Sequence, residues 1–155
     1  MAVSVLFVCL GNICRSPLAE AALRREADKL GLELEIDSAG TGDWHVGRPP
    51  DPRAIAAARR NGVDISHLRA RRVTARDFER FDHIVALDTE NLAALERMRP
   101  DGARATLSLL LDHVEGREGG AVADPYYGEA EEFDATWSDV VLGAAALARK
   151  IAAGR

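Results

Sequence analysis

The chain has little of what marks secreted, membrane-spanning or metal-stapled proteins. Only two of its 155 residues are cysteine, so disulfide bonds are not what holds the fold together. The longest apolar run near the start, residues 2–10, is far too short to span a membrane. It also lacks the leading basic residues of a secretory signal. We therefore expect a cytoplasmic protein.

Positive charge is also scarce, because 20 Lys and Arg residues face 25 Asp and Glu residues for a net charge of -5. That sign is wrong for a chain that wraps nucleic acid or lies on an anionic membrane, so we expect neither as a partner. Cys9 and Cys14 have no second Cys or His pair at zinc-finger spacing. We accordingly expect no structural metal, and any anion must be bound at a local site.

Apolar and charged residues occur in the proportions of a soluble globular protein, 47% and 29%. The length suits one domain over residues 1–155, and the sequence shows no internal repeat. Apolar segments typical of buried strands alternate with amphipathic segments typical of helices. Strands are expected near residues 3–8, 33–37, 84–87 and 105–111, the second at an edge and the last running into a turn of helix.

Helices are expected after each of the first three strands and at the end of the chain. Predicted helix starts are Ser16 with Pro17, Asp51 with Pro52, and Thr89, and an apolar stripe with three- and four-residue spacing runs from Phe133 to Ile151. The pattern predicts an α/β fold: a single-domain open parallel sheet of about four strands with helices on both faces. In such sheets ligands bind beyond the carboxyl ends of the strands.

The loop after the first predicted strand, residues 9–16, is therefore expected to be a phosphate-binding loop. Its backbone N–H groups can turn around one anion, and the helix that follows adds a partial positive charge. Gly11 allows tight curvature, and Arg15 supplies a planar fork that matches two oxygens of an oxyanion. A cysteine at the mouth of such a loop is expected to be a reactive thiolate, and Ser16 can donate its hydroxyl to the sulfur.

Each of these residues has a plainer interpretation when taken alone. Cys9 could be a small buried hydrophobe at the end of a strand, Arg15 a surface charge and Ser16 only a helix cap. Their order within one strand, loop and helix favours the chemical interpretation.

In this loop the sequence closely resembles the low-molecular-weight protein tyrosine phosphatases, whose signature is C-x5-R-[ST] near the N-terminus. The similarity covers residues 8–20 almost without gaps and continues in family order over most of the chain, through residues 37–42, 44–45, 50–53, 67–71 and 124–128.

The resemblance implies a metal-independent phosphatase with no cofactor, acting on phosphotyrosine in protein substrates through a cysteinyl-phosphate intermediate. Cys9 would be the nucleophile, Arg15 would bind the phosphoryl oxygens, and Asp124 would be the general acid. An Asp before Pro is otherwise usually a turn residue. The rest of the substrate-binding loop would be Leu10, Gly11, Asn12, Ile13, Cys14 and Ser16.

Two further groups of residues follow from the same resemblance. Trp44, Tyr126 and Tyr127 would wall the cleft and stack on an aromatic substrate, although each could equally be a packing aromatic. The residues expected to brace the phosphate loop by hydrogen bonds are Asn12, Ser38, His67 and Asp88. Their plainer interpretations are, in that order, a left-handed turn residue, a strand end, an interior histidine and a helix cap.

Three other functions are compatible with a phosphate-binding loop of this kind. An arsenate reductase would need a later cysteine pair, and none follows Cys14. A phosphoarginine phosphatase of the same family would carry Thr where Ile13 stands. A non-catalytic phosphate-binding or redox-sensing module would keep the loop but perform no turnover, and pure phosphate binding needs neither the nucleophile Cys9 nor the acid Asp124. By its spacing from Cys9, Cys14 fits a reversible disulfide switch as well as it fits a small buried residue that packs the loop against the sheet, and the resemblance favours the switch. We expect a monomer or a weak homo-oligomer.

Overall fold

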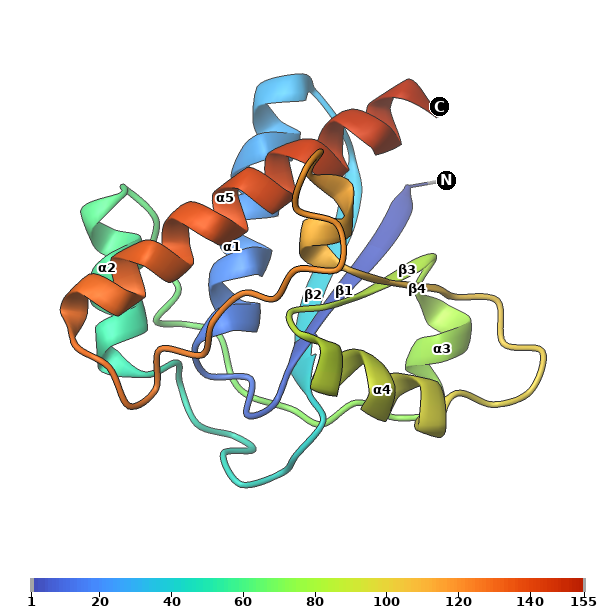
Figure 1. Cartoon of the computed structure of the whole chain (residues 1–155), viewed down its shortest axis with the longest axis horizontal. Helices are drawn as coiled ribbons and strands as arrows, with labels where there is room; N and C mark the ends of the chain where they lie inside the picture. Colours follow the sequence, from blue (N-terminus) through green and yellow to red (C-terminus); the bar gives the residue numbers. More distant parts are fainter. Residues whose placement is uncertain (1, 155) are drawn as a thin grey trace.

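The computed structural model describes residues 2–154 and shows an open, fully parallel four-stranded sheet in the order β2-β1-β3-β4 (Figure 1). The elements in chain order are β1 (Val3–Cys9), α1 (Arg15–Leu30), β2 (Leu34–Gly40), α2 (Pro52–Arg60), α3 (Asp77–Arg80), β3 (His83–Ala86), α4 (Thr89–Met98), β4 (Thr106–Leu109), the 3-10 helix η1 (Leu110–His113) and α5 (Ala130–Ala153). The predicted fold class is confirmed, including the edge position of β2.

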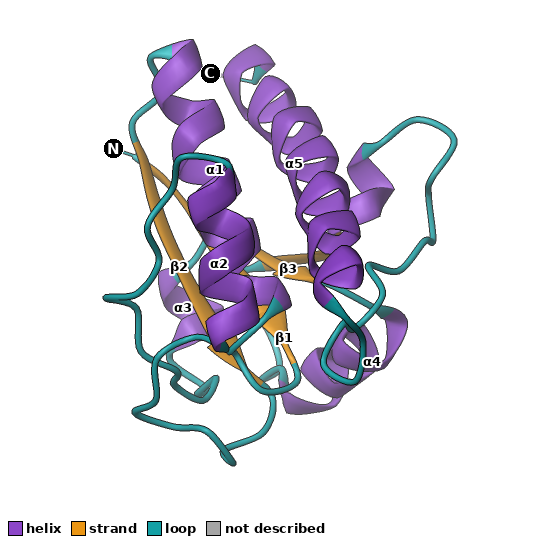
Figure 2. Ribbon diagram, turned by 90° about the vertical axis from the view of Figure 1, so that its left-hand side faces the viewer, coloured by secondary structure: helices purple, strands orange, loops and turns teal. Residues whose placement is uncertain are grey.

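Helices cover both faces of the sheet. The central strand β1 carries apolar side chains on both sides, and each side must be buried against helices. Val5 and Phe7 face a core shared with α1, α2 and α5, whereas Leu6 and Val8 face a second core shared with α3 and α4. Figure 2 shows α1, α2 and α5 together in front of the strands, with α4 behind them. Because β1 is buried on both faces, its carboxyl end is held in place, and so is the start of the loop that follows it.

The last helix packs closely on α1 and on η1, which follows β4 as predicted. Gly143 makes this approach possible, since a Cβ atom there would lie 2.4 Å from Cγ of Leu110. None of the helices in the described residues is long and apolar enough to cross a membrane.

The predicted helix starts are partly right. Asp51 caps α2 by accepting a hydrogen bond from the Arg53 N–H at 2.8 Å. The other two starts lie one or two residues earlier than expected: α1 follows Cys14, and α4 is capped by Asp88, which accepts from the backbone N–H of Asn91. Ser16 therefore lies inside the first turn of α1, where its hydroxyl is free for another partner.

Candidate active site

The loop between β1 and α1 is held by its carbonyl groups. The backbone N–H groups of Thr41, Gly42 and Asp51 donate to the carbonyls of Cys9, Leu10 and Ile13, each at 2.9 Å. Within residues 2–154, the N–H groups of residues 11–14 donate no hydrogen bond to another protein group. The loop thus keeps a row of backbone donors available for an anion, as an oxyanion nest requires.

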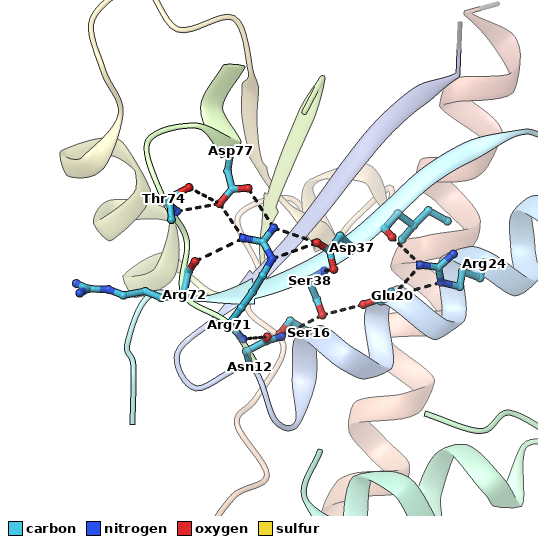
Figure 3. A network of polar contacts seen from close by, with 11 residues as sticks. Asn12, Ser16, Glu20, Arg24, Asp37, Ser38, Arg71, Arg72, Thr74 and Asp77 are labelled. Atoms are coloured by element: carbon cyan, nitrogen blue, oxygen red, sulfur yellow. Dashed lines mark hydrogen bonds and ion pairs between the residues drawn. The ribbon is translucent and has the colours of Figure 1, made fainter. Parts of the chain in front are cut away.

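Asn12 is the residue on which the loop turns. It is the one non-glycine residue with positive φ in the described chain, at 58°, and its side chain is 2% exposed. Its amide oxygen accepts from the backbone N–H of Arg71 at 3.0 Å, which fixes the orientation of the amide. The amide nitrogen then donates to Ser16 Oγ at 2.8 Å and to Ser38 Oγ at 3.0 Å (Figure 3).

These contacts determine which acceptor each serine hydroxyl donates its hydrogen bond to, at Ser16 and at Ser38. Ser38 donates to the buried carboxylate of Glu20 at 2.9 Å. Ser16 accepts from Asn12, and its own proton is left for Cys9 Sγ, which lies 3.0 Å from Ser16 Oγ. The Ser16 hydroxyl is thus placed to donate a hydrogen bond to the Cys9 sulfur. Asn12 thereby orients a donor toward Cys9 without contacting it.

Two charged groups that the sequence analysis did not select anchor this network. Glu20 is 2% exposed and pairs with Arg24 at 2.9 Å. Arg71 forms ion pairs with Asp37 and Asp77, both at 3.0 Å. Glu20 and Arg24 follow Ser16 at successive four-residue steps along α1, which is a signal that the sequence does contain.

Arg15 is buried at 3% exposure beneath the mouth of the loop. It donates to Asp88 at 2.6 Å and to the carbonyl of Val122 at 3.1 Å, and it lies 3.6 Å from a carboxylate oxygen of Asp124. Burial opposes the charge, but the negative charges of Cys9, Asp88 and Asp124 outweigh it and raise the pKa of Arg15. The guanidinium is therefore a permanent cation in the loop.

Cys14 differs from Cys9 in its surroundings, although both are buried free cysteines. Burial strongly raises the pKa of the Cys14 thiol, and the nearby charges of Asp51, Cys9 and Asp124 raise it further. Cys14 is consequently a neutral thiol across the physiological pH range.

The predicted catalytic and wall residues line one cleft of about 340 Å³. Its lining consists of Cys9, Leu10, Gly11, Ile13, Cys14, Arg15, Trp44, His45, Asp124, Tyr126 and Tyr127. His45 is an addition to the predicted set. Trp44 is 66% exposed and Tyr127 is 97% exposed, so both residues lie at the rim of the cleft rather than in the core. Asn12 and Ser16 lie behind the cleft as supports.

The prediction for His67 is wrong. His67 is exposed and lines a separate hollow with Arg24, Arg25 and Asp28, and no hydrogen bond among the described residues joins it to the phosphate loop. The reason is the turn in its segment, where Ile65 occupies the core at 1% exposure. The backbone N–H of Arg71 braces the loop in its place. Asn12, Ser38 and Asp88 do lie in the expected hydrogen-bond contacts.

Comparisons with known proteins agree with this geometry. Residues 4–154 match the family model described as low molecular weight phosphotyrosine protein phosphatase. A phosphatase of that name from Schizosaccharomyces pombe is 48% identical over 134 residues, covering 84% of this chain and 85% of the relative.

Two solved structures extend the comparison to the fold. The crystal structure of YfkJ from Bacillus subtilis has a TM-score of 0.91 at 41% identity, covering 100% of this chain and 98% of its own. That of a Drosophila arginine phosphatase has a TM-score of 0.89 at 32% identity, covering 95% and 96%. Motif, loop geometry and comparisons agree, and the chain belongs to the low molecular weight phosphotyrosine protein phosphatase family.

Proposed function

We propose that this chain hydrolyses phosphotyrosine monoesters in protein substrates through a covalent intermediate on Cys9. The observation that carries the proposal is that one cleft is lined by a sulfur, a buried guanidinium, a carboxylate and exposed aromatic rings. The first two sit in a loop with free backbone donors, so the phosphoryl group and the nucleophile share one site. All of these groups come from one chain, and we propose that it works as a monomer or a weak homo-oligomer.

In the first step the Cys9 thiolate attacks phosphorus. The sulfur–phosphorus bond forms as the bond to the phenolic oxygen breaks, and Asp124 in its acid form gives that oxygen a proton. Arg15 and the N–H groups of residues 11–14 bind the equatorial oxygens, on which charge is spread in the transition state. Once the sulfur–phosphorus bond has formed, Cys9 is no longer a thiolate, and the Ser16 hydroxyl has no negative sulfur to stabilise.

In the second step water attacks the phosphocysteine. Asp124, now a carboxylate, accepts a proton from the water, phosphate is released, and the electron pair of the broken bond returns to Cys9. The Ser16 hydroxyl at 3.0 Å then stabilises the leaving thiolate. The same contact therefore serves the resting enzyme and the second step.

The cleft favours an aryl ester over the rival substrates. Trp44, Tyr126 and Tyr127 provide ring surfaces at the rim, on which a phenol ring can stack. Ile13 lines the cleft with an apolar side chain that offers no acceptor to a guanidine N–H. Arsenate reduction would need further cysteines, and the chain has only Cys9 and Cys14. Pure phosphate binding would use neither Cys9 nor Asp124.

A substrate panel tests this function. The purified protein, assayed with a metal chelator present, should release phosphate from a phosphotyrosine peptide. The initial rate of phosphate release from matched phosphoserine and phosphoarginine peptides, at the same sub-saturating concentration, should be lower by about tenfold or more. Cys9→Ser serves as the blank and should be inactive. Preference for phosphoarginine, or activity that disappears with the chelator, would contradict the proposal.

Asp124→Asn tests the general acid. This variant should lose roughly 10²- to 10⁴-fold in kcat on phenyl phosphate, whose leaving group needs a proton. The loss should be much smaller on an aryl phosphate with a nitro-substituted, easily expelled phenol. The measurement is kcat for both substrates in wild type and variant. An equal loss on the two substrates would show that Asp124 supports the structure and donates no proton.

We also propose that the two cysteines form a reversible redox switch in a reducing, cytoplasmic setting. Peroxide oxidises the Cys9 thiolate to a sulfenic acid. Cys14 then loses its proton as its sulfur attacks the Cys9 sulfur; the disulfide forms, and that proton leaves with the hydroxyl of the sulfenic acid as water. Cys14 lies on the same short loop, and as a neutral buried thiol it is itself shielded from peroxide.

Cys14→Ser separates this switch from simple oxidation. Wild type treated with peroxide and then with a thiol reductant should regain most of its activity. The variant should stay inactive, because its Cys9 continues to sulfinic acid. Mass spectrometry of the loop peptide, taken after peroxide and before the reductant, should show a loss of two hydrogens in wild type and a gain of two oxygens in the variant. Equal recovery of the two proteins would contradict the switch.

A further inference from the structure

The start of α2 touches two loops of the active site at once. The backbone N–H of Asp51 donates to the carbonyl of Ile13 in the phosphate loop at 2.9 Å. Two residues later, Arg53 extends toward residues 124–128, the segment that carries the proposed general acid. In Figure 1 the last part of the loop before α5 passes beside α2.

The guanidinium of Arg53 is held in one orientation. Its Nε and Nη2 atoms donate to the two carboxylate oxygens of Asp51 at 3.0 and 2.9 Å. The group also lies over the ring of Phe133, with 4.6 Å between the guanidinium carbon and the ring centroid. Such a fork on a carboxylate is a rigid arrangement, and stacking on the ring restrains it further.

The remaining donors of this group reach the acid loop. Nη2 donates to the carbonyl of Tyr126 at 2.8 Å, and Nη1 donates to the carbonyl of Gly128 at 3.0 Å. Within residues 2–154, Arg53 makes the only hydrogen bonds that join residues 124–128 to other parts of the chain. The hydrogen bond from Tyr126 N–H to Asp124 is internal to the segment.

We propose that Arg53 is a positioning residue that holds Asp124 over the phosphate loop. The inference rests on the proposed function, in which Asp124 gives its proton to the leaving group. A general acid works only within hydrogen-bond reach of the oxygen it protonates. Arg53 reaches Asp124 through the backbone of its loop, and Asp51 ties the same helix end to Ile13. The phosphate loop and the loop that carries the acid are thus both joined to the first turn of α2.

Arg53→Met removes the donors and keeps an apolar stem over Phe133. The variant should lose about tenfold or more in kcat on phenyl phosphate and about threefold or less on the nitro-substituted ester. In an Asp124→Asn background, Arg53→Met should cause no further loss on phenyl phosphate, because both changes remove the same proton transfer. Equal losses on both substrates, or additive losses in the double variant, would overturn the proposal.

Arg60→Met is the matched control. Arg60 is the last residue of α2, at the end far from Arg53, and forms an exposed ion pair with Asp134 at 2.6 Å. This variant should keep wild-type kcat on both substrates. Hydrogen exchange provides a readout independent of catalysis. The backbone amides of Tyr126 and Gly128, which donate hydrogen bonds within the segment, should exchange about tenfold faster in Arg53→Met than in Arg60→Met. Equal exchange would overturn the proposal. An inactive wild type would instead contradict the proposed function.

Discussion

The amide of Asn12 is the interaction on which the rest of the site depends. A left-handed turn at a non-glycine residue is costly, and here the side chain repays it with three hydrogen bonds. Because its oxygen is committed to the Arg71 N–H, its nitrogen must donate to both Ser16 and Ser38. The loop conformation and the donor to the Cys9 sulfur are therefore set together.

Ion pairs hold the residues at the two ends of the hydrogen-bond network around Asn12. Glu20 is a buried acceptor that takes the Ser38 proton, and Arg24 compensates its charge. Arg71 is restrained by Asp37 and Asp77, which places its backbone N–H at Asn12. Glu20 and Asp77 are themselves buried, so removing the arginine partner of either one would leave a buried carboxylate without its compensating charge. The reactive loop is thus supported from β2, α1 and the segment before α3.

Local signals in the sequence were enough to predict the sheet and the phosphate loop. The uninterrupted apolar run of β1, the glycine after it and the helix that follows are all encoded within about 20 residues. Asp88 shows how two interpretations can both hold, since it caps α4 and also pairs with Arg15. Thr89 also suits a helix cap by residue type, but the carboxylate of Asp88 takes that role.

Contacts between distant segments were beyond sequence reasoning. His67 was assigned by its place in a similar motif, yet the turn around Ile65 directs it away from the loop. Arg53 lies two residues after a well-predicted helix start, and its contacts with Tyr126 and Gly128 span more than 70 residues. Nothing in the periodicity of either segment indicates that pairing, because it depends on how α2 packs against α5.

The central claim is that this prearranged loop delivers the sulfur of Cys9 to phosphorus. Rapid denaturation of the enzyme during turnover of an aryl phosphate, followed by digestion and mass spectrometry, tests it directly. Transfer to sulfur predicts one phosphoryl group on the peptide that contains Cys9 and Cys14, with fragment ions that place it on Cys9. A phosphoryl group on another residue, or an unmodified peptide during rapid turnover, would contradict the account.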